Sequence, residues 1–214
     1  NASRARVTAT LSDWDAFDYE DIMDIEKINF DDKKIIAEST AKAIGRREDQ
    51  LIIDALEAAI VGGNTVGDGT AAFSLTLVAS AAQMLDENNV PSEDRTIIYT
   101  AKQKEQFLSS TTVTSSDYNT VKALVAGQLD TFYGFKFITI GSRTEGGLPR
   151  EAGVQQYAFA YHKQAVGLAI GKDMTTMVDW VAGKLAWQIG CVYSAGAIVI
   201  DADGMVAIDT DDNP

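Results

Sequence analysis

The sequence predicts an α+β fold, because strand-like and helix-like segments occupy different parts of the chain. Over residues 155–208 apolar residues recur with the two-residue period of strands, for example at Tyr157, Phe159 and Tyr161. Over residues 31–61 the apolar period is that of a helix. No repeat of about 20–50 residues is visible, which argues against solenoids and propellers.

The composition is that of an ordinary globular protein that is strongly acidic. The length of 214 residues is enough for one large core or two small ones. Of these residues 46% are hydrophobic and 23% are charged, and the net charge is −13. This charge argues against a sequence-reading nucleic-acid binder, which needs a basic surface. No apolar run is long enough to predict a membrane span. With a single cysteine and no signal peptide, the cytoplasm is the default compartment.

The first residues predict an extended arm. Residues 4–11 (RARVTATL) alternate as a strand does. A lone strand is not stable without a partner strand, so we expect a chain that is truncated, processed or only partly represented at its N-terminus.

One long helix is predicted over residues 31–61. Asp31 or Asp32 caps it, Phe30 acts as a hydrophobic staple, and Gly62-Gly63 ends it. About 30 residues correspond to about 45 Å, which is long for a chain of this size. Its apolar face is expected to contain Ile36, Ile44, Leu51, Ala55, Leu56 and Ile60. The basic pairs Lys33-Lys34 and Arg46-Arg47 are expected on a solvated helix face.

A glycine-rich loop at residues 62–69 is predicted to connect to a second helix capped by Asp68. That helix ends at Asn88-Asn89 and Pro91 and is followed by a buried strand at 95–99 and a short helix at 102–108. The apolar stripe of the second helix is expected to contain Ala71, Leu75, Val78, Ala82 and Leu85.

The remaining elements follow in order. A third helix begins at Ser115 or Ser116 and ends at Gly127, with Tyr118, Val121 and Val125 on one face. An aromatic strand contains Phe132, Tyr133, Phe135 and Phe137, and residues 141–153 form a surface loop. Another strand contains Val178, Trp180 and Ala182, and residues 197–208 are predicted to fold back as a hairpin around Asp203-Gly204. The acidic residues 209–213 are expected to be a solvated terminus.

The chain offers little chemistry, and we predict no catalytic, cofactor-binding or metal-ligating residue. The segment VGGNTVGDGT lacks the preceding strand and the Lys-Ser/Thr of a phosphate loop, and DADG at residues 201–204 lacks the remaining ligands of a calcium loop. His162 has no oriented nucleophile and is interpreted as a structural histidine at a strand end. Cys191 is interpreted as a small buried hydrophobe, and the tryptophans Trp14, Trp180 and Trp187 as packing residues.

Four segments carry a resemblance to a known family: residues 37–56 (AESTAKAIGRREDQLIIDAL), 90–108 (VPSEDRTIIYTAKQKEQFL), 127–142 (GQLDTFYGFKFITIGS) and 157–170 (YAFAYHKQAVGLAI). In this order they resemble the spine helix, the passage into the axial domain, the aromatic return through it, and the strand back into the peripheral domain of the major capsid proteins of tailed bacteriophages. This is the Hong Kong 97-type capsid fold. The outgoing half of that family's extended loop has no counterpart here, and no Lys–Asn crosslink can be placed.

The resemblance implies a domain organisation: an extended loop arm at 1–30, a peripheral domain with the spine helix at 31–100, an axial domain at 101–154, and a returning sheet of both domains at 155–214. It also implies a major capsid protein, not an enzyme, that assembles as hexamers and pentamers into an icosahedral shell around double-stranded DNA. The expected location is the virion, after assembly in the host cytoplasm, without a membrane. Portal, scaffold and decoration proteins are the further partners that the family implies, and the packaged DNA would be held without sequence-specific contact.

The arm would then lie over a neighbouring subunit, which would cover its unpaired edge. The residues expected in contacts between subunits are Val7, Leu11, Trp14, Phe17, Ile22, Arg46 and Arg47. Two alternatives stay open. An encapsulin-like nanocompartment has the same fold but encloses enzymes, and a small-molecule hydrolase would use His162 with a carboxylate.

Overall fold

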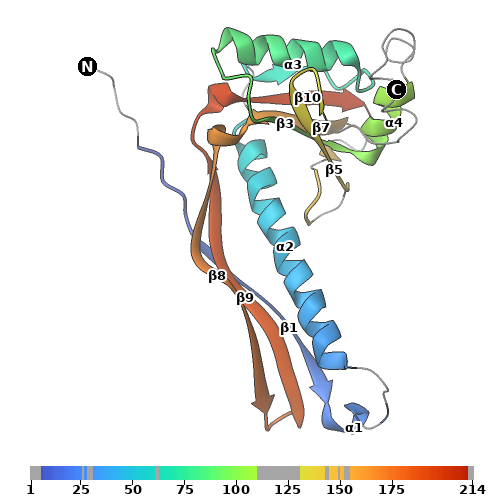
Figure 1. Ribbon diagram of the computed structural model, residues 1–214, viewed down its shortest axis with the longest axis vertical. Coiled ribbons are helices and arrows are strands. Elements are labelled where there is room, and N and C mark those ends of the chain that lie inside the picture. Colours follow the sequence, from blue (N-terminus) through green and yellow to red (C-terminus); the bar gives the residue numbers. More distant parts are fainter. Residues whose placement is uncertain are drawn as a thin grey trace. The chain divides into compact units, whose positions relative to one another are not determined.

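The computed structural model describes residues 6–25, 27, 31–60, 63–109, 131–142, 145–148, 150–151 and 155–211, without the side chains of 24, 25, 131, 132, 150 and 151. The chain forms two compact units (Figure 1). Unit 1 comprises Asn1–Ile52 and Leu168–Ile198, and unit 2 comprises Ile53–Gly167 and Val199–Pro214. Helices and strands occur in both, which confirms the α+β prediction. Among the described helices, none combines the length and the apolar character that a membrane span requires.

Unit 2 is built on a seven-stranded mixed sheet. The strand order is β2 (Thr65–Val66), β10 (Met205–Asp211), β7 (Gln155–His162), β3 (Arg95–Thr100), β5 (Phe135–Ile140) and β4 (Thr131–Phe132), with β6 (Arg150–Glu151) paired to β7. β3 lies parallel to β5 and antiparallel to β7. Its sequence RTIIYT buries Ile97, Ile98 and Tyr99 in succession, as expected of a strand covered on both faces.

The main core of unit 2 lies between this sheet and two helices, α3 (Leu75–Glu87) and α4 (Ala101–Ser109). Val78, Ala82 and Leu85 recur at helical spacing and give α3 a buried stripe, as predicted. α4 contributes Phe107, whose ring lies 5.7 Å from that of Phe73 between centroids. The predicted strand at 95–99 and helix at 102–108 are both confirmed.

The face of β7 that is fully buried is not the aromatic one. Ala158 and Ala160 belong to the core, whereas Tyr157 and Tyr161 are half-buried. Small residues on this face suit the close approach of other elements. The predicted strand period is therefore confirmed, and on the aromatic face only the middle residue, Phe159, is fully buried.

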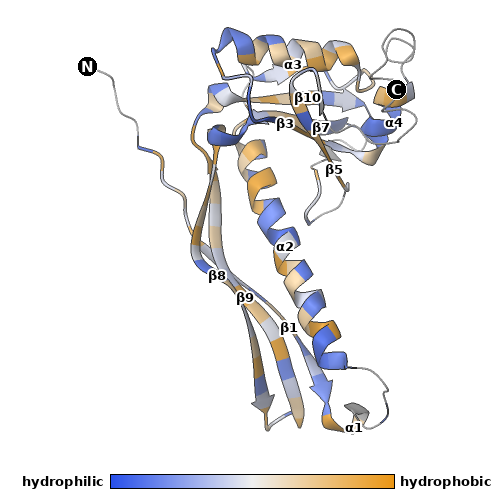
Figure 2. Ribbon diagram, in the orientation of Figure 1, coloured by the Kyte–Doolittle hydropathy of each residue, from blue (hydrophilic) through white to orange (hydrophobic). Residues whose placement is uncertain are grey.

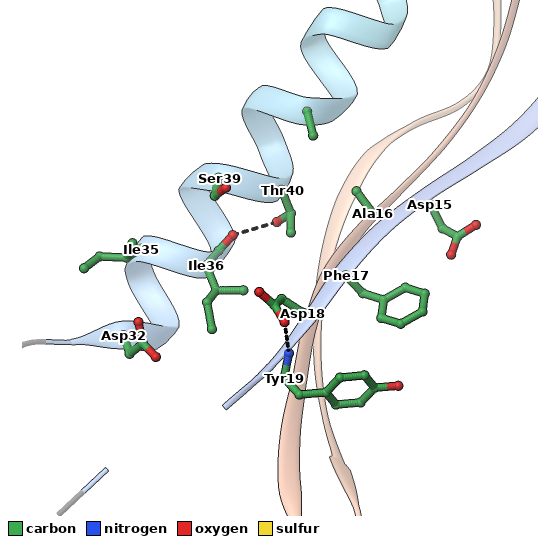
Figure 3. Close-up of a pocket in the computed structure, with 11 residues that line it drawn as sticks. Asp15, Ala16, Phe17, Asp18, Tyr19, Asp32, Ile35, Ile36, Ser39 and Thr40 are labelled. Atoms are coloured by element: carbon green, nitrogen blue, oxygen red, sulfur yellow. Dashed lines mark hydrogen bonds between the residues drawn. The ribbon is translucent and has the colours of Figure 1, made fainter. Parts of the chain in front are cut away.

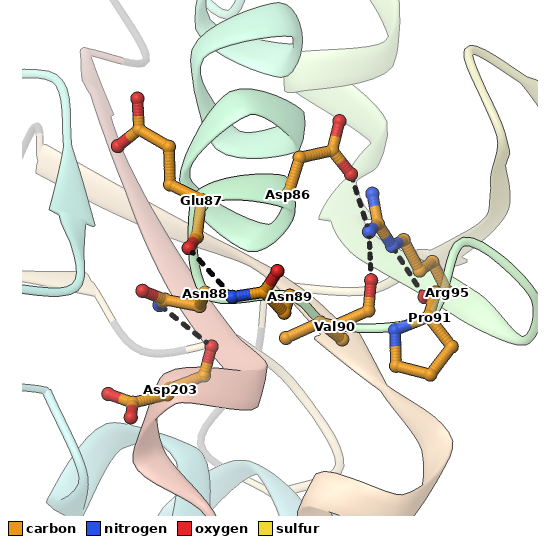
Figure 4. A network of polar contacts seen from close by, with 8 residues as sticks. All are labelled: Asp86, Glu87, Asn88, Asn89, Val90, Pro91, Arg95 and Asp203. Carbon is orange, nitrogen blue, oxygen red and sulfur yellow. Dashed lines mark hydrogen bonds and ion pairs between the residues drawn. The ribbon is translucent and has the colours of Figure 1, made fainter.

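A polar network fixes the turn from α3 into β3 (Figure 4). The guanidinium of Arg95, only 5% exposed, donates to the carbonyl of Pro91 at 2.8 Å and to the Asp86 carboxylate at 2.7 Å. Asn89 has a φ of 56°, the left-handed conformation common where a helix ends. The predicted stop is confirmed. The predicted start is wrong: the helix follows Ser74, and Asp68 instead accepts from the N–H and hydroxyl of Thr70.

Unit 1 contains a three-stranded sheet in the order β1 (Ser12–Asp21), β9 (Ala186–Val199) and β8 (Val166–Val181), of which β8 enters the unit at Leu168. β1 and β9 are antiparallel, with Trp14 opposite Tyr193 and Ala16 opposite Cys191. A short helix, α1 (Ile22–Ile25), follows β1. The predicted strand at residues 4–11 is wrong for 6–11, which are not in a strand; residues 4 and 5 lie outside the described part.

The predicted long helix is present as α2 (Asp32–Ala58), 27 residues without interruption. Asp31 caps it, since its carboxylate accepts from the N–H of Lys34 at 3.3 Å. In unit 1 the helix packs Ile44 against Cys191, Tyr193 and Ala195 of β9. Phe30 and Gly62, the predicted staple and C-cap, lie outside the described residues.

The predicted hairpin at 197–208 is wrong. The turn exists as the short 3-10 helix η2 (Ala202–Gly204), but β9 pairs with β1 and β8, whereas β10 pairs with β7 and β2. The chain thus changes sheets at this turn. The predicted solvated tail is wrong for 209–211, because these residues belong to β10 and pair with β7. Another 3-10 turn, η1 (Lys163–Ala165), connects β7 to β8.

Three further predictions need correction. The aromatic strand is a hairpin, β4 and β5, which reverses at Tyr133 and Gly134, both with positive φ. The glycine-rich connector contains β2, which pairs with β10. The loop at 141–153 is not wholly at the surface, because Leu148 is buried. The predicted helix at 115–127 lies outside the described residues.

Candidate assembly surfaces

The seven residues predicted to contact other subunits all belong to unit 1, and two of them contact each other. Arg47 of α2 lies over the ring of Trp14 of β1, with its guanidinium carbon 3.7 Å from the ring centroid. Trp14 also packs against the cluster of Ile44 and Tyr193. Trp14 is therefore half-buried within its own unit, so Trp14→Ala would remove contacts of its own chain. This variant cannot separate folding from assembly.

The other arm residues lack such cover. Val7, Leu11, Phe17 and Ile22 are each between 45% and 49% exposed. They lie before β1, within it and directly after it. Their contact with another subunit stays a prediction.

The basic pairs on α2 lie only partly in solvent, contrary to the prediction. The ammonium of Lys33 is 3.7 Å from the carboxylate of Glu20 and 4.4 Å from the ring centroid of Trp187. Lys34, the next residue, is exposed, and Arg46 is half-buried. One member of each pair, Lys33 and Arg47, thus attaches α2 to the sheet.

Sequence reasoning missed a group of exposed apolar side chains on the edge strand β8. Figure 2 shows orange bands, which mark apolar residues, along this strand. Each of the group is at least 41% exposed; its members are Ile170, Met174, Met177, Val178 and Trp180. The alternation of Val178 and Trp180 is visible in the sequence. Trp180 packs as predicted, with its ring centroid 5.3 Å from that of Trp187, yet it stays 41% exposed. Exposed apolar residues grouped on an unpaired edge strand are typical of a contact surface.

The face of the sheet opposite α2 is acidic. Phe17 and Asp15 of β1 line a shallow hollow together with Met177 and Asp179 of β8. Asp13 lies on the same side and accepts a hydrogen bond from the hydroxyl of Ser194 at 2.6 Å. This face therefore combines isolated apolar side chains with carboxylates.

A groove of about 670 Å³ lies between β1 and the first half of α2 (Figure 3). Ile35 and Ile36 line it from the helix and Asp18 from the strand, and the rings of Phe17 and Tyr19 point away from it. The charged residues of its lining are all acidic. The groove is thus apolar at its helix side and negative at its strand side.

Tyr193 lies beneath α2 and has an unusual environment. Burial, and then the negative charge of Glu48, raise the pKa of its hydroxyl. The neighbouring thiol of Cys191 is 3.5 Å from the hydroxyl of Thr40 and 3.3 Å from that of Thr176. Cys191 is buried, as predicted.

The motifs considered as chemical sites occupy structural positions. His162 ends β7, is buried, and accepts through Nδ1 from the N–H of Gln164. Gly67 and Gly69 have positive φ, and a Cβ on Gly67 would clash with the carbonyl of Asp209. The Thr70 hydroxyl lowers the pKa of the exposed Asp68 carboxyl. Among the described residues, no group of three or more His, Cys, Asp or Glu is placed to hold a metal ion.

Solved capsid structures have the same fold. The capsid protein of the Helicobacter pylori bacteriophage KHP30 matches with a TM-score of 0.74 at 11% identity, over 96% of this chain and 76% of that one. The capsid of the cyanophage P-SCSP1u matches with 0.73 at 16% identity, over 94% and 73%. The SrpI encapsulin of Synechococcus elongatus matches with 0.65 at 12% identity, over 96% and 75%.

No curated protein matches the chain. The family model described as phage capsid protein matches residues 1–212, almost the whole sequence. Together with the capsid fold, this match shows a structural shell protein. The chain belongs to the phage capsid protein family.

Proposed function

We propose that this protein is the major capsid protein of a tailed bacteriophage, and that hexamers and pentamers of it form an icosahedral shell around double-stranded DNA. The observation that carries the proposal is the family match over residues 1–212. The exposed apolar residues of unit 1 support it, since they occur on both edge strands, β1 and β8. Contacts between two different surfaces of one protein generate rings, which a shell requires.

The charge of the chain agrees with this proposal. A chain with a net charge of −13 repels phosphate overall, which agrees with packed DNA that is not held by tight or sequence-specific contacts. The virion is the proposed location, after assembly in the host cytoplasm. Portal, scaffold and decoration proteins are the further partners of such a shell.

The division into peripheral and axial domains is part of the proposal. Residues 31–100 would be the peripheral domain with α2 as its spine, residues 101–154 the axial domain, and residues 155–214 the sheet that returns through both. Residues 1–30 would be the arm. Val7, Leu11, Phe17, Ile22 and Arg46 are the proposed contacts between subunits, with Trp14 and Arg47 holding the arm to α2.

Negative-stain imaging and sedimentation of the purified full-length protein test the proposal. Closed particles or rings of many copies are expected, and a small soluble oligomer would contradict it. We also propose that the protein has no catalytic activity. His162→Ala should therefore leave particle yield largely unchanged; loss of a measurable turnover by this variant, with particles intact, would contradict the structural role.

A second candidate is a shell that encloses protein instead of DNA. The similarity to the SrpI encapsulin, with a TM-score of 0.65, supports this second candidate. The contents of native particles separate the two. Nuclease-protected DNA supports the viral shell, and a co-purified protein cargo without DNA supports the nanocompartment.

A further inference from the structure

β1 has a free edge that can accept another strand. Its partner β9 lies on one side, and the described sheet has no strand on the other. Just after β1, the N–H of Ile22 donates to the carbonyl of Leu185 on the β9 side. Because successive N–H groups alternate in direction, those of Asp15, Phe17 and Tyr19 point to the free edge. The N–H of Tyr19 is held there by the carboxylate of Asp18 at 2.8 Å.

The surroundings of this edge select the kind of strand that fits. Residues 13–21 (DWDAFDYED) contain five acidic residues and no Lys or Arg. Beside them, the groove of Figure 3 offers the apolar side chains of Ile35, Ile36 and Ala43. An extended segment that is basic on one face and carries small apolar side chains on the other matches both features.

The chain itself contains such a segment. Arg4 and Arg6 are the sole charged residues among the first twelve, so this block is positive where the next one is negative. With strand alternation, Arg4, Arg6 and Thr8 share one face. The other face carries Ala5, Val7 and Ala9, which are small enough for a narrow groove.

A chain cannot readily place this segment on its own β1. The carbonyl of Thr10 lies so close to Gly196 of β9 that a Cβ there would be 2.0 Å from it. The segment before Ser12 therefore continues along β9 in the direction of β1. To reach the free edge of its own β1, the chain would have to reverse within the few residues before Ser12.

We propose that residues 4–9 of a second copy add to the free edge of β1 as an extra strand. Ala5, Val7 and Ala9 enter the groove beside α2, and Arg4 and Arg6 meet carboxylates of the acidic face. The contact joins two different surfaces of one protein, so it can repeat around a ring. This inference rests on the proposed shell function and specifies one of its contacts.

Charge exchange tests the pairing in the full-length protein. Arg4→Glu with Arg6→Glu, and separately Asp13→Lys with Asp15→Lys, should each weaken association by about tenfold, because like charges then face each other. A chain that carries all four changes should recover most of the loss. Failure of the combined variant to recover would overturn the proposal.

The matched control reverses two acids elsewhere in unit 1. Asp173 of β8 and Glu38 of α2 are exposed, and neither lines the groove or the hollow that contains Asp15. Asp173→Lys with Glu38→Lys changes the net charge by the same amount as the β1 variant. It should not be rescued by Arg4→Glu with Arg6→Glu, and rescue would show that only net charge matters.

Crosslinking between copies tests the location. One chain carries Val7→Cys and a second, differently tagged chain carries Ala43→Cys, both with Cys191→Ser. A disulfide-linked pair of the two chains is expected under mild oxidation. A link that forms only within a chain carrying both cysteines, or no link while particles assemble, would overturn the inference and leave the shell function standing. Absence of particles from wild-type protein would instead contradict the shell function, and the mixed crosslink would still report on the strand.

Discussion

The two units differ in how far their large apolar side chains are exposed. In unit 2, Phe73, Phe107 and Phe135 are at most 1% exposed. In unit 1, Phe17, Met174 and Trp180 are between 41% and 49% exposed. The difference lies in the layers. Unit 2 has a seven-stranded sheet with a core packed beneath α3 and α4, whereas the three strands of unit 1 pack against α2 alone.

A sheet with one helix cannot cover both of its faces and both of its edges. The apolar residues on the open parts of unit 1 are therefore available to other molecules. We infer that the stability of the isolated chain depends mainly on unit 2 and that assembly depends mainly on unit 1. The predictions below test this division.

The largest expected effect comes from comparing the replacement of phenylalanine by alanine in the two units. Phe107→Ala should lower the free energy of unfolding by about 3–5 kcal/mol, because it empties a fully buried aromatic site. Phe17→Ala should change it by less than about 1 kcal/mol, because that ring is half exposed. Urea unfolding of unassembled protein measures both.

The effects of the two variants on particle yield should have the reverse order, when yield is compared for protein that is still folded. Phe17→Ala is expected to lower it, because the ring lies on the proposed contact surface. Equal losses of monomer stability in the two variants would contradict the division between the units.

The next effect concerns a buried polar network in unit 2. The fully buried amide of Gln103 accepts from the N–H of Thr100 at 2.8 Å and donates to Thr210 Oγ1 at 2.8 Å and to the carbonyl of Gln156 at 3.2 Å. Gln103→Leu leaves the buried N–H of Thr100 without its acceptor and should cost about 2–3 kcal/mol. Thermal unfolding followed by circular dichroism measures the loss.

Gln83→Leu is the matched control for that variant. Gln83 is exposed on α3 and donates to Glu87 at 2.9 Å. Its replacement should change stability by no more than about 0.5 kcal/mol. If both leucine variants were equally stable, the network would have no part in holding α4 to the sheet.

The contrast between the units also explains which features were predictable from the sequence. Elements with strong local signals were found: α2 from its cap and period, α3 from its stripe, and β3 from its apolar run. The local signal at Asp203-Gly204 was equally clear and misleading. The turn forms, but which sheet receives β10 is decided by pairing with β7, far away in the sequence.

The candidate site was only partly predictable for a related reason. Alternation along β8 is readable in the sequence, but whether its apolar face is covered depends on the number of layers, which no local pattern reports. Trp14 was expected to contact another subunit, yet within its own chain Arg47 covers its ring. A cation 33 residues away in sequence decided this, so the pattern around Trp14 could not show it.

A smaller effect separates the neighbours Arg46 and Arg47. Arg47→Ala removes the cation over Trp14 and should cost the monomer about 1 kcal/mol. Arg46→Ala should leave monomer stability within about 0.5 kcal/mol and lower particle yield instead. Chemical unfolding and sedimentation, made on the same samples, give the two readouts. Interchanged results would place Arg46, not Arg47, in the fold of unit 1.

The smallest effect is expected at Tyr193 of unit 1, a buried tyrosine that has a counterpart in Tyr99 of unit 2. The hydroxyl of Tyr193 is buried beside the carboxylate of Glu48, so Tyr193→Phe should change stability near neutral pH by no more than about 1 kcal/mol. Burial raises the pKa of Tyr193 in unit 1 and of Tyr99 in unit 2 above the ordinary 10.0. A group whose pKa is higher in the folded than in the unfolded chain contributes stability that is complete below the unfolded value. That contribution is lost as the pH rises through the folded value.

Wild-type stability should therefore fall as the pH rises above about 10. Tyr193→Phe should lose less than the wild type, because only Tyr99 of the pair still titrates. Tyr99→Phe should likewise keep only the contribution of Tyr193. Urea midpoints measured from pH 8 upward would show the difference, and identical slopes for all three proteins would mean that neither tyrosine governs the alkaline limit.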